Sequence, residues 1–242
     1  ETGYGWRVAF LVVGLPGILI ALLVRFTVSE PPRGYSEALV HELPPPPFWA
    51  VVRFLFASPV LRNVVIAGTL TAFAGYASVI WVPIYLVRIH EMGTGEAGTY
   101  LALTLGVGGA IGIYLGGRIA DHLGKKYGEH WLAWLVAIVG LISVPFMLLC
   151  FFAETAETAI LAYAIPAFLG TIYVACGFAL IQNHTPLEMR SVCAAINLFI
   201  LNIIGLGLGP FSIGLLSDLF EPSMGQDSLR YCLLYTSDAA DD

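Results

Sequence analysis

The sequence predicts an all-α membrane protein, and its composition and the length of its apolar runs carry that prediction. Of 242 residues, 58% are hydrophobic and only 12% are charged, far from the averages of soluble domains. Six uncharged apolar runs reach or approach the ~20 residues that a helix needs to cross a bilayer. The net charge of −6 is a poor guide to partners, because Asp238, Asp241 and Asp242 in the tail supply half of it.

The stretch Leu105–Lys126 is the most informative of these runs. Gly108, Gly112 and Gly116 recur at every fourth residue and would form one smooth helix face. In water each glycine would cost a helix about 1 kcal/mol relative to alanine. In lipid, small residues instead let two backbones approach closely. We therefore expect a helix-packing face here.

The polar end of this stretch carries the pattern Gly117-x-x-x-Asp121-x-x-Gly124-Lys125-Lys126. Glycine would permit a tight reversal, and the acid would lie near a neighbouring helix N-terminus. The pattern resembles the signature loop of the major facilitator superfamily, with His122 where that family has Arg or Lys. The resemblance implies a gating segment. The alternative is a generic basic turn between two membrane helices. A dinucleotide-binding fingerprint is a weaker alternative, because the glycine spacing of Gly106-x-Gly108-x-x-x-Gly112 is wrong for it and no strand precedes it.

The remaining elements follow from apolar runs and capping signals. Ser58-Pro59 predicts a helix start, and Thr185-Pro186-Leu187-Glu188 predicts a capping box. We expect a first span over Val8–Val24, a short interfacial helix over Phe48–Phe56, and further spans over Asn63–Val87, Ala97–Gly117, Trp131–Phe152, Thr158–Gln182 and Ser191–Ser217.

The eleven Lys and Arg residues give an orientation. With the glycine-motif loop on the cytoplasmic side, Arg25, Arg33, Arg53, Arg62, Arg118, Lys125, Lys126 and Arg190 are cytoplasmic, and Arg7, Arg88 and Arg230 are not. This division agrees with the positive-inside rule.

Further stretches resemble spinster-type transporters and their bacterial relatives within that superfamily. They are Gly5–Gly17, Ser29–Gly34, Asn202–Pro210 and Asp227–Tyr231. The resemblance implies the C-terminal six-helix half, a 3+3 inverted repeat, of a twelve-helix facilitator fold. Gly205-x-x-x-Gly209-Pro210 also resembles the superfamily's glycine-proline helix motif, with Ile213 replacing one glycine. That motif implies a pliable helix pair near the gate.

The resemblance also sets the expected domains. Residues 1–28 would be the sixth transmembrane helix of the N-terminal half. Residues 29–58 would be a cytoplasmic linker, with Pro44–Pro47 in polyproline II form, and the interfacial helix. Residues 59–235 would hold helices seven to the start of twelve. The last helix, from Leu229, fails after two turns, so we interpret 236–242 as a foreign or truncated tail.

By the same resemblance, the function is alternating-access secondary transport of a small, amphipathic or lipid-like solute, such as sphingosine phosphate or a lysophospholipid, across a bacterial inner membrane. The expected partners are that solute, the lipid bilayer and the missing N-terminal half, with no nucleic acid. Asp, Glu, Lys, Arg and His are absent from the five spans after the linker. Because intramembrane ionisable groups mark proton relays, any coupling carboxylate must lie in the absent helices.

Neutral polar residues are therefore the candidate ligands. The wider set is Tyr76, Ser78, Trp81, Tyr85, Tyr100, Tyr163, Thr171, Tyr173, Gln182, Asn197 and Asn202. From it we select Tyr76, Trp81, Tyr85, Tyr173 and Asn202 as substrate-binding, since the family's seventh, tenth and eleventh helices contribute to its cavity. Trp81 and Tyr85 lie four residues apart on one helix face. The alternative for each residue is an interhelical hydrogen bond.

Other classes of function remain open. A non-transporting receptor or scaffold of the same fold would need no transport residues, and a facilitator could carry a drug, sugar or organic anion instead. A membrane enzyme is disfavoured, because His41, His90, His122, His130 and His184 lie in polar segments at no ligand spacing. The four cysteines, with no Cys-x-x-Cys, are expected to pack in helices. We expect no catalytic residue, metal or cofactor.

Overall fold

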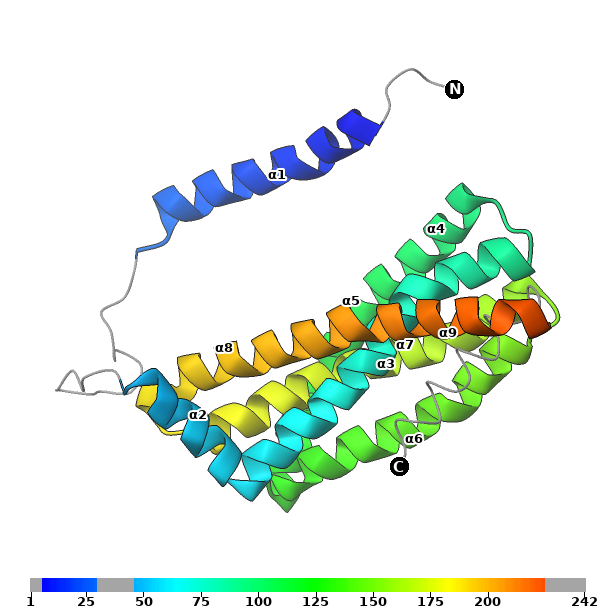
Figure 1. The fold of residues 1–242 in the computed structure, drawn as a ribbon. Helices are drawn as coiled ribbons and strands as arrows, with labels where there is room; N and C mark the ends of the chain where they lie inside the picture. Colours follow the sequence, from blue (N-terminus) through cyan, green and yellow to red (C-terminus); the bar gives the residue numbers. More distant parts are fainter. Residues whose placement is uncertain (1–5, 30–45, 225–242) are drawn as a thin grey trace. The chain divides into compact units, whose positions relative to one another are not determined.

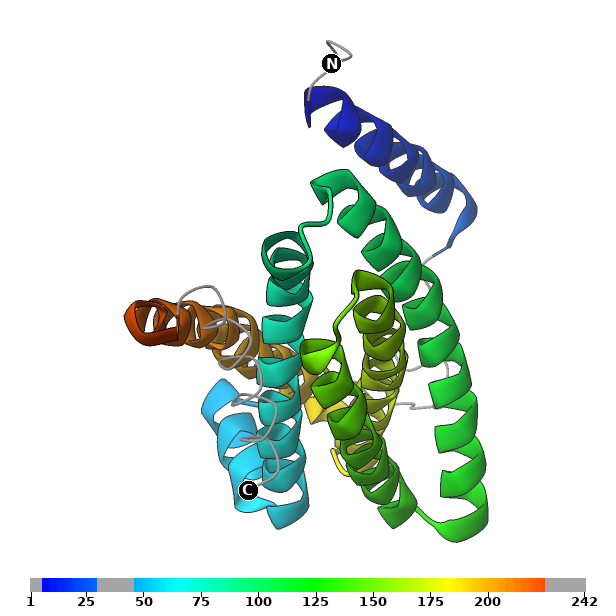
Figure 2. The same cartoon turned by 90° about the vertical axis from the view of Figure 1, so that its right-hand side faces the viewer.

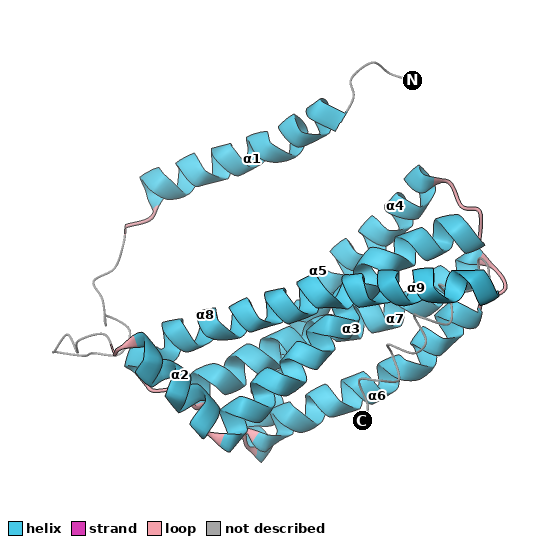
Figure 3. Cartoon of the chain, viewed as in Figure 1, coloured by secondary structure: helices cyan, strands magenta, loops and turns pink. Residues whose placement is uncertain are grey.

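A computed structural model describes residues 6–29 and 46–224, in two parts that are treated separately here. The first part is the single helix α1 (Trp6–Thr27), which contains Pro16 and carries Arg25 in its last turn. The second part is a helical bundle, and helices and short connections account for all of its described residues (Figure 3). Most of the expected linker, the last helix from Leu229 and the tail 236–242 lie outside the described residues.

The bundle begins with α2 (Phe48–Ala57) and α3 (Pro59–Ile89), as expected. Ser58 separates them, and its Oγ accepts a hydrogen bond from the backbone N–H of Leu61 at 3.5 Å. Pro59 occupies the first helical position, where its missing N–H costs nothing. The cap predicted at Ser58 is therefore confirmed.

The other elements follow in antiparallel order (Figure 1). They are α4 (Thr94–Ala102), η2 (Leu103–Gly108), α5 (Gly109–Tyr127), α6 (His130–Phe152), α7 (Ala156–Asn183), η3 (Leu187–Met189), α8 (Arg190–Ile200), η4 (Leu201–Leu208) and α9 (Gly209–Met224). Elements η2 and η4 are π-helical, and η3 is a 3₁₀ turn. The helices α4–η2–α5 and α8–η4–α9 each run on as one continuous rod.

Six helical stretches of the described chain are long and apolar enough to cross a membrane, which confirms the membrane class. They are Phe10–Thr27, Pro59–Ile89, Thr94–Tyr127, His130–Phe152, Ala156–Asn183 and Leu187–Phe220. The prediction of a capping box at Thr185 is wrong. Thr185 is buried and its hydroxyl has no partner among the described residues. The 3₁₀ turn η3 intervenes, so α8 begins only at Arg190.

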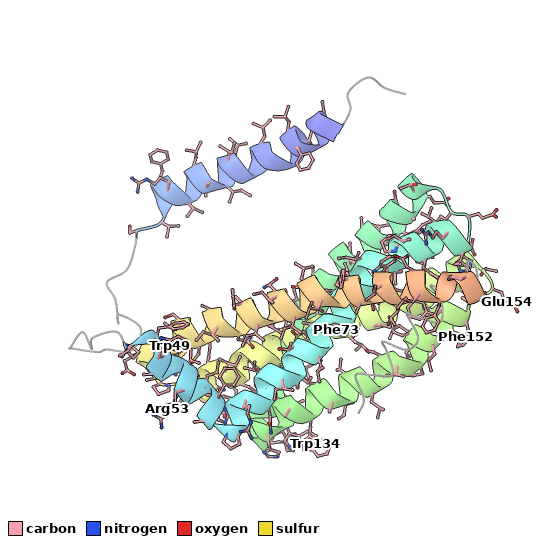
Figure 4. All side chains as sticks on the ribbon, in the orientation of Figure 1. Trp49, Arg53, Phe73, Trp134, Phe152 and Glu154 are labelled. Atoms are coloured by element: carbon pink, nitrogen blue, oxygen red, sulfur yellow. The ribbon has the colours of Figure 1, made fainter. Side chains whose placement is uncertain are left out.

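Charge divides the two ends of the bundle. At one end, here the basic end, lie Arg53, Arg62, Arg118, Lys125, Lys126 and Arg190. Among described residues of the bundle, Arg88 is the one such cation at the opposite, acidic end, beside Glu91, Glu96, Glu154 and Glu157. Figure 4 shows Trp49 and Arg53 at one end and Phe152 and Glu154 at the other. The positive-inside rule would place the basic end in the cytoplasm.

Three buried apolar clusters hold the bundle together. The cluster at the acidic end joins α3, α4, α6, α7 and α9 around Tyr85 and Phe151. A second joins α2, α3, α7 and α8 at the basic end, where Val51 and Leu55 of α2 are wholly buried. The third packs α5 and α6 on α7. Large apolar side chains such as Phe199 and Leu141 are exposed on the outside, as a lipid-facing surface requires.

Two close helix crossings depend on glycine. At Gly112 of α5, an added Cβ would lie 2.5 Å from the backbone oxygen of Phe168 on α7. At Gly209 of α9, it would lie 2.6 Å from the backbone oxygen of Phe73 on α3. Figure 4 shows Phe73 near the middle of α3. Both crossings therefore bring backbones together at a point that no larger residue would allow.

The predicted packing face on α5 is wrong at one position. Gly112 and Gly116 meet Phe168 and Ile172 of α7, but a Cβ at Gly108 would have no heavy atom within 4 Å. Gly109 is turned toward α7 instead, with Thr171 Cγ2 3.6 Å from its Cβ position. The π-helical η2 ends at Gly108. Gly109, Gly112 and Gly116 are spaced by three and four residues within α5, so they share one face of an α-helix.

The two crossings are related by an internal repeat. Phe73 lies in Ala72-Phe73-Ala74-Gly75 and Phe168 in Ala167-Phe168-Leu169-Gly170. In each case the partner glycine follows closely on a π-helical segment. Helices α3 and α7 run in opposite directions (Figure 1). Opposed copies of one unit are what a 3+3 inverted repeat consists of.

The crossing at Gly112 gives the first prediction. Gly112→Ala places a methyl group against Phe168 O and Thr171 Oγ1, so it should destabilise the bundle by about 1–3 kcal/mol through overpacking. The measurement is the thermal unfolding midpoint of the purified chain in detergent. The matched control is Gly108→Ala, whose methyl group meets open space. Equal midpoints for the two variants would contradict the crossing.

Candidate functional site

Tyr85 is a structural residue in this structure. Its side chain is 0% exposed, and its hydroxyl lies 3.0 Å from Phe151 O and 3.2 Å from Cys150 O, at the end of α6. Both carbonyls belong to the last turn of α6, where the usual helical partners are missing. Cys150 O also accepts from the N–H of the cap residue Ala153 at 3.4 Å, and the Tyr85 hydroxyl provides a donor to Phe151 O. His90 Nε2 lies 3.2 Å from the same hydroxyl. The expectation that Tyr85 lines a ligand cavity is wrong, because it is sealed between α3 and α6.

Trp81 also connects two helices. Its indole N–H donates to the backbone oxygen of Pro210 at 2.9 Å, which ties α3 to α9. Gly214 provides the space for the ring, since a Cβ there would lie 3.1 Å from Trp81 Cζ2. The indole N–H is therefore engaged, although the ring remains partly exposed. Pro210 therefore contacts the candidate residue Trp81 through its backbone carbonyl.

Tyr173, Tyr76 and Asn202 have a different environment. The ring of Tyr173 lies over Gly68 of α3, with Cε2 3.6 Å from that glycine's Cβ position. Tyr76 is partly buried beside Gly205 of η4. Asn202 is exposed, and its amide donates to Leu198 O of the same helix at 2.8 Å. These three residues stay available to a solute.

A small hollow lies between α3, α7 and the α8–η4 rod, next to Tyr173. Its lining residues are Val64, Gly68, Tyr173, Val174, Gly177, Phe178, Ile181, Asn197 and Leu201. Of the selected residues only Tyr173 belongs to it. Asn197 was in the wider polar set but was not selected. In the sequence, Asn197 and Asn202 are both single polar residues in an apolar helix. That pattern does not show which of the two lines the hollow.

The signature segment is helical to its end. Gly117, Asp121, Gly124, Lys125 and Lys126 all lie in α5, which continues to Tyr127. The expectation that the chain reverses direction within the motif is wrong. It occurs at Gly128, whose φ of +96° favours glycine. Gly124 packs on α6 instead, with Leu132 Cδ1 3.1 Å from its Cβ position, and Gly117 meets open space. Asp121, Lys125 and Lys126 are exposed.

Two further polar contacts lie toward the basic end. Arg118 Nη1 donates to Tyr114 OH at 3.1 Å on the α5 surface. His184, which ends α7, has Nε2 3.6 Å from a carboxylate oxygen of Glu129 and Nδ1 3.0 Å from Leu180 O. The contact between His184 and Glu129 joins the α5–α6 turn to α7. Within the described ranges, His, Cys, Asp and Glu form no group of three that could hold a metal.

These features define a class: a polytopic membrane protein in which a unit of three spans packs against two spans of an opposed unit, with an uncharged interior and a basic end. Comparison of the sequence gives the family. Residues 2–210 match the profile of the Major Facilitator Superfamily, and the chain belongs to that family. Membership agrees with the expectation that the chain is not an enzyme.

Among curated proteins, the chain is 31% identical over 230 residues to an MFS-type efflux pump of Mycolicibacterium smegmatis, covering 95% of this chain and 52% of the pump. It is 28% identical to a probable galactarate/D-glucarate transporter of Bacillus subtilis, over 84% of this chain and 47% of that protein. It is 27% identical to human protein spinster homolog 1, over 88% and 43% respectively. The chain thus spans about half the length of these relatives.

A solved structure agrees with this assignment. A bacterial homologue of the human lysosomal transporter Spinster, in an inward-facing and unoccupied conformation, superposes with a TM-score of 0.74 at 25% identity. The superposition covers 98% of this chain and 57% of that one. The all-helical facilitator fold and the likeness to spinster proteins are therefore both supported.

Tyr85 gives the second prediction. Tyr85→Phe removes the hydroxyl that serves the carbonyls of Cys150 and Phe151, so it should destabilise the chain by about 1 kcal/mol. The thermal unfolding midpoint measures this. Tyr100→Phe, at an exposed position on α4, is the control and should leave the midpoint unchanged. A Tyr85→Phe variant of unaltered stability would argue against the structural role.

Proposed function

We propose that this chain forms half of a secondary transporter that works by alternating access, moving a small amphipathic solute. Alternating access needs two repeats that rock about a central site near the bilayer midplane. The family membership, the inverted repeat and the coverage of about half of each relative support this arrangement. The solute site would lie on the face that meets the other half of the transporter.

The uncharged interior is the observation that supports an amphipathic solute. Residues 63–87, 97–117, 131–152, 158–182 and 191–217 contain no Asp, Glu, Lys, Arg or His. Charged cargo and proton relays need such groups at membrane depth. Here the available polar groups are Tyr76, Tyr173 and Asn202, and an aromatic ring with one polar atom suits a molecule that is partly apolar. Charge would be recognised by helices outside this chain.

The relatives' names cover several cargoes. One is called an efflux pump, one a galactarate/D-glucarate transporter and several are spinster homologues. A sugar diacid has no long apolar part for the apolar and aromatic residues of these spans to hold, whichever helices recognise its charge. This favours an amphipathic cargo over a sugar acid for this half of the site.

The third prediction concerns flux. The full-length transporter containing this sequence, reconstituted in proteoliposomes, should move a long-chain lysophospholipid faster than glucarate, because apolar burial contributes about 0.8 kcal/mol per CH₂ group. Affinity should also rise with chain length. The 242-residue chain alone should give no flux above empty vesicles. Equal affinity for short-chain and long-chain lysolipids would contradict the amphipathic assignment while leaving the family unaffected.

The fourth prediction concerns the signature segment. Asp121 is exposed at the basic end, distant in sequence from the hollow and with no ion pair formed inside the described part of the chain. It is therefore placed to act on a neighbouring element during the conformational change. Asp121→Ala in the full-length transporter should slow maximal flux about tenfold or more, with little change in solute affinity. A loss of affinity at unchanged maximal flux would contradict a gating role.

A further inference from the structure

The hollow between α3, α7 and the α8–η4 rod has room for about one water-sized group, with a volume of about 10 Å³ open to the centre of such a group. By this measure a space needs ~10–15 Å³ to hold one water, so the hollow suits a single hydroxyl-sized group of a larger molecule. Asn197 lies seven residues after Arg190, where α8 begins at the basic end. At 1.5 Å per residue the amide is about 10 Å along the helix. The hollow is thus inside the span.

Asn197 is the unusual side chain in this hollow. It is 4% exposed, and its amide forms no hydrogen bond with any residue that the structure describes. Other polar side chains of the spans bond to their own helix: Thr69 Oγ1 to Val65 O at 2.7 Å and Asn202 Nδ2 to Leu198 O at 2.8 Å. The Asn197 amide is therefore free for a group that enters the hollow.

Tyr173 lines the α7 wall of the hollow. Its hydroxyl likewise has no hydrogen bond within the described residues, and its ring is held against Gly68 and Gly177. The other lining residues are apolar, and none is charged. A charged group would be desolvated here without a counter-charge, which is costly. A neutral hydrogen-bonding group fits.

We propose that this hollow binds a neutral hydroxyl group of the transported solute, and that Asn197 determines specificity for it. The proposal rests on the transport function proposed above. A side-chain amide offers both donors and an acceptor, so it can pair fully with a hydroxyl but only half with an ether oxygen. Discrimination against a ligand that lacks the hydroxyl follows, because the buried amide would again be left unpaired.

The test uses the 242-residue chain in phosphatidylcholine nanodiscs. The probes are radiolabelled 1-monooleoylglycerol and its 2,3-di-O-methyl ether, which share one acyl chain and differ in their hydroxyls. Equilibrium dialysis against empty nanodiscs measures the specific binding of each. The wild-type chain should prefer the monoacylglycerol on the order of tenfold. Asn197→Leu should abolish this preference, so that both probes bind as weakly as the ether.

The matched control is Asn63→Leu, the same substitution at an exposed position near the basic end of α3, which should retain the preference. Stability gives a second readout. Because Leu is close to Asn in volume and has no polar group to satisfy, Asn197→Leu should raise the thermal unfolding midpoint. A structural amide would give the opposite sign. Asn197→Ser, which keeps a hydroxyl in the hollow, should recover part of the preference.

Three results would overturn the proposal. Equal binding of the two probes by the wild-type chain would exclude hydroxyl recognition while leaving the amphipathic transporter in place. A lower unfolding midpoint for Asn197→Leu would show that the amide supports the fold. Binding of neither probe would remove the hollow as a subsite, and if lysophospholipid flux by the full-length transporter also failed, the transport proposal would fall with it.

Discussion

Close approach of helix backbones is the constraint on which the rest of this bundle depends. Lipid tails are as apolar as leucine, so helices gain nothing by moving apolar side chains from lipid to protein. The helices are therefore held together by dense van der Waals contact between them. At Gly112 and Gly209, the backbones of α5 and α9 come against carbonyl oxygens of α7 and α3, at positions where a methyl group would collide. These contacts fix how deep each rod lies in the bundle, and so they place Asn197, Trp81 and Tyr173.

Polar groups inside the spans follow a second rule: most are satisfied locally. Ser78 donates to Ala74 O and Ser143 to Val139 O, each within its own helix. Trp81 and Tyr85 bond across helices and tie α3 to α9 and α6. Because most polar groups of the spans already have hydrogen-bond partners, the few polar side chains without one are candidates for binding a ligand. Asn197 and Tyr173 meet in one hollow, which is the arrangement expected of a recognition site in an otherwise apolar wall.

Most of the fold could be predicted from the sequence because apolar length and interfacial signals act locally. The span Trp131–Phe152 and the cap at Ser58 needed no tertiary information. The register of the α5 glycine face could not be predicted, because Gly108 and Gly109 both fit a helical spacing to Gly112, and only packing against α7 decides which of them makes contact. Tyr85 was misassigned for a similar reason. Its partners are the end of α6, more than sixty residues away, and aromatic residues that seal a core look the same in sequence as those that line a cavity.

The crossings also bear on how such a chain could have arisen. Helices α3 to α6 form one three-helix unit, and α7 with the α8–η4–α9 rod begins the second. Yet the glycine rod of the first unit packs chiefly on α7, and that of the second packs on α3. Each unit therefore completes its partner's core, as the exchanged arms of a swapped dimer do. A single three-helix ancestor would have exposed its glycine stripe with nothing to fill it. Such a unit would be stable only as an antiparallel pair, and fusing two copies into one chain makes that pairing permanent.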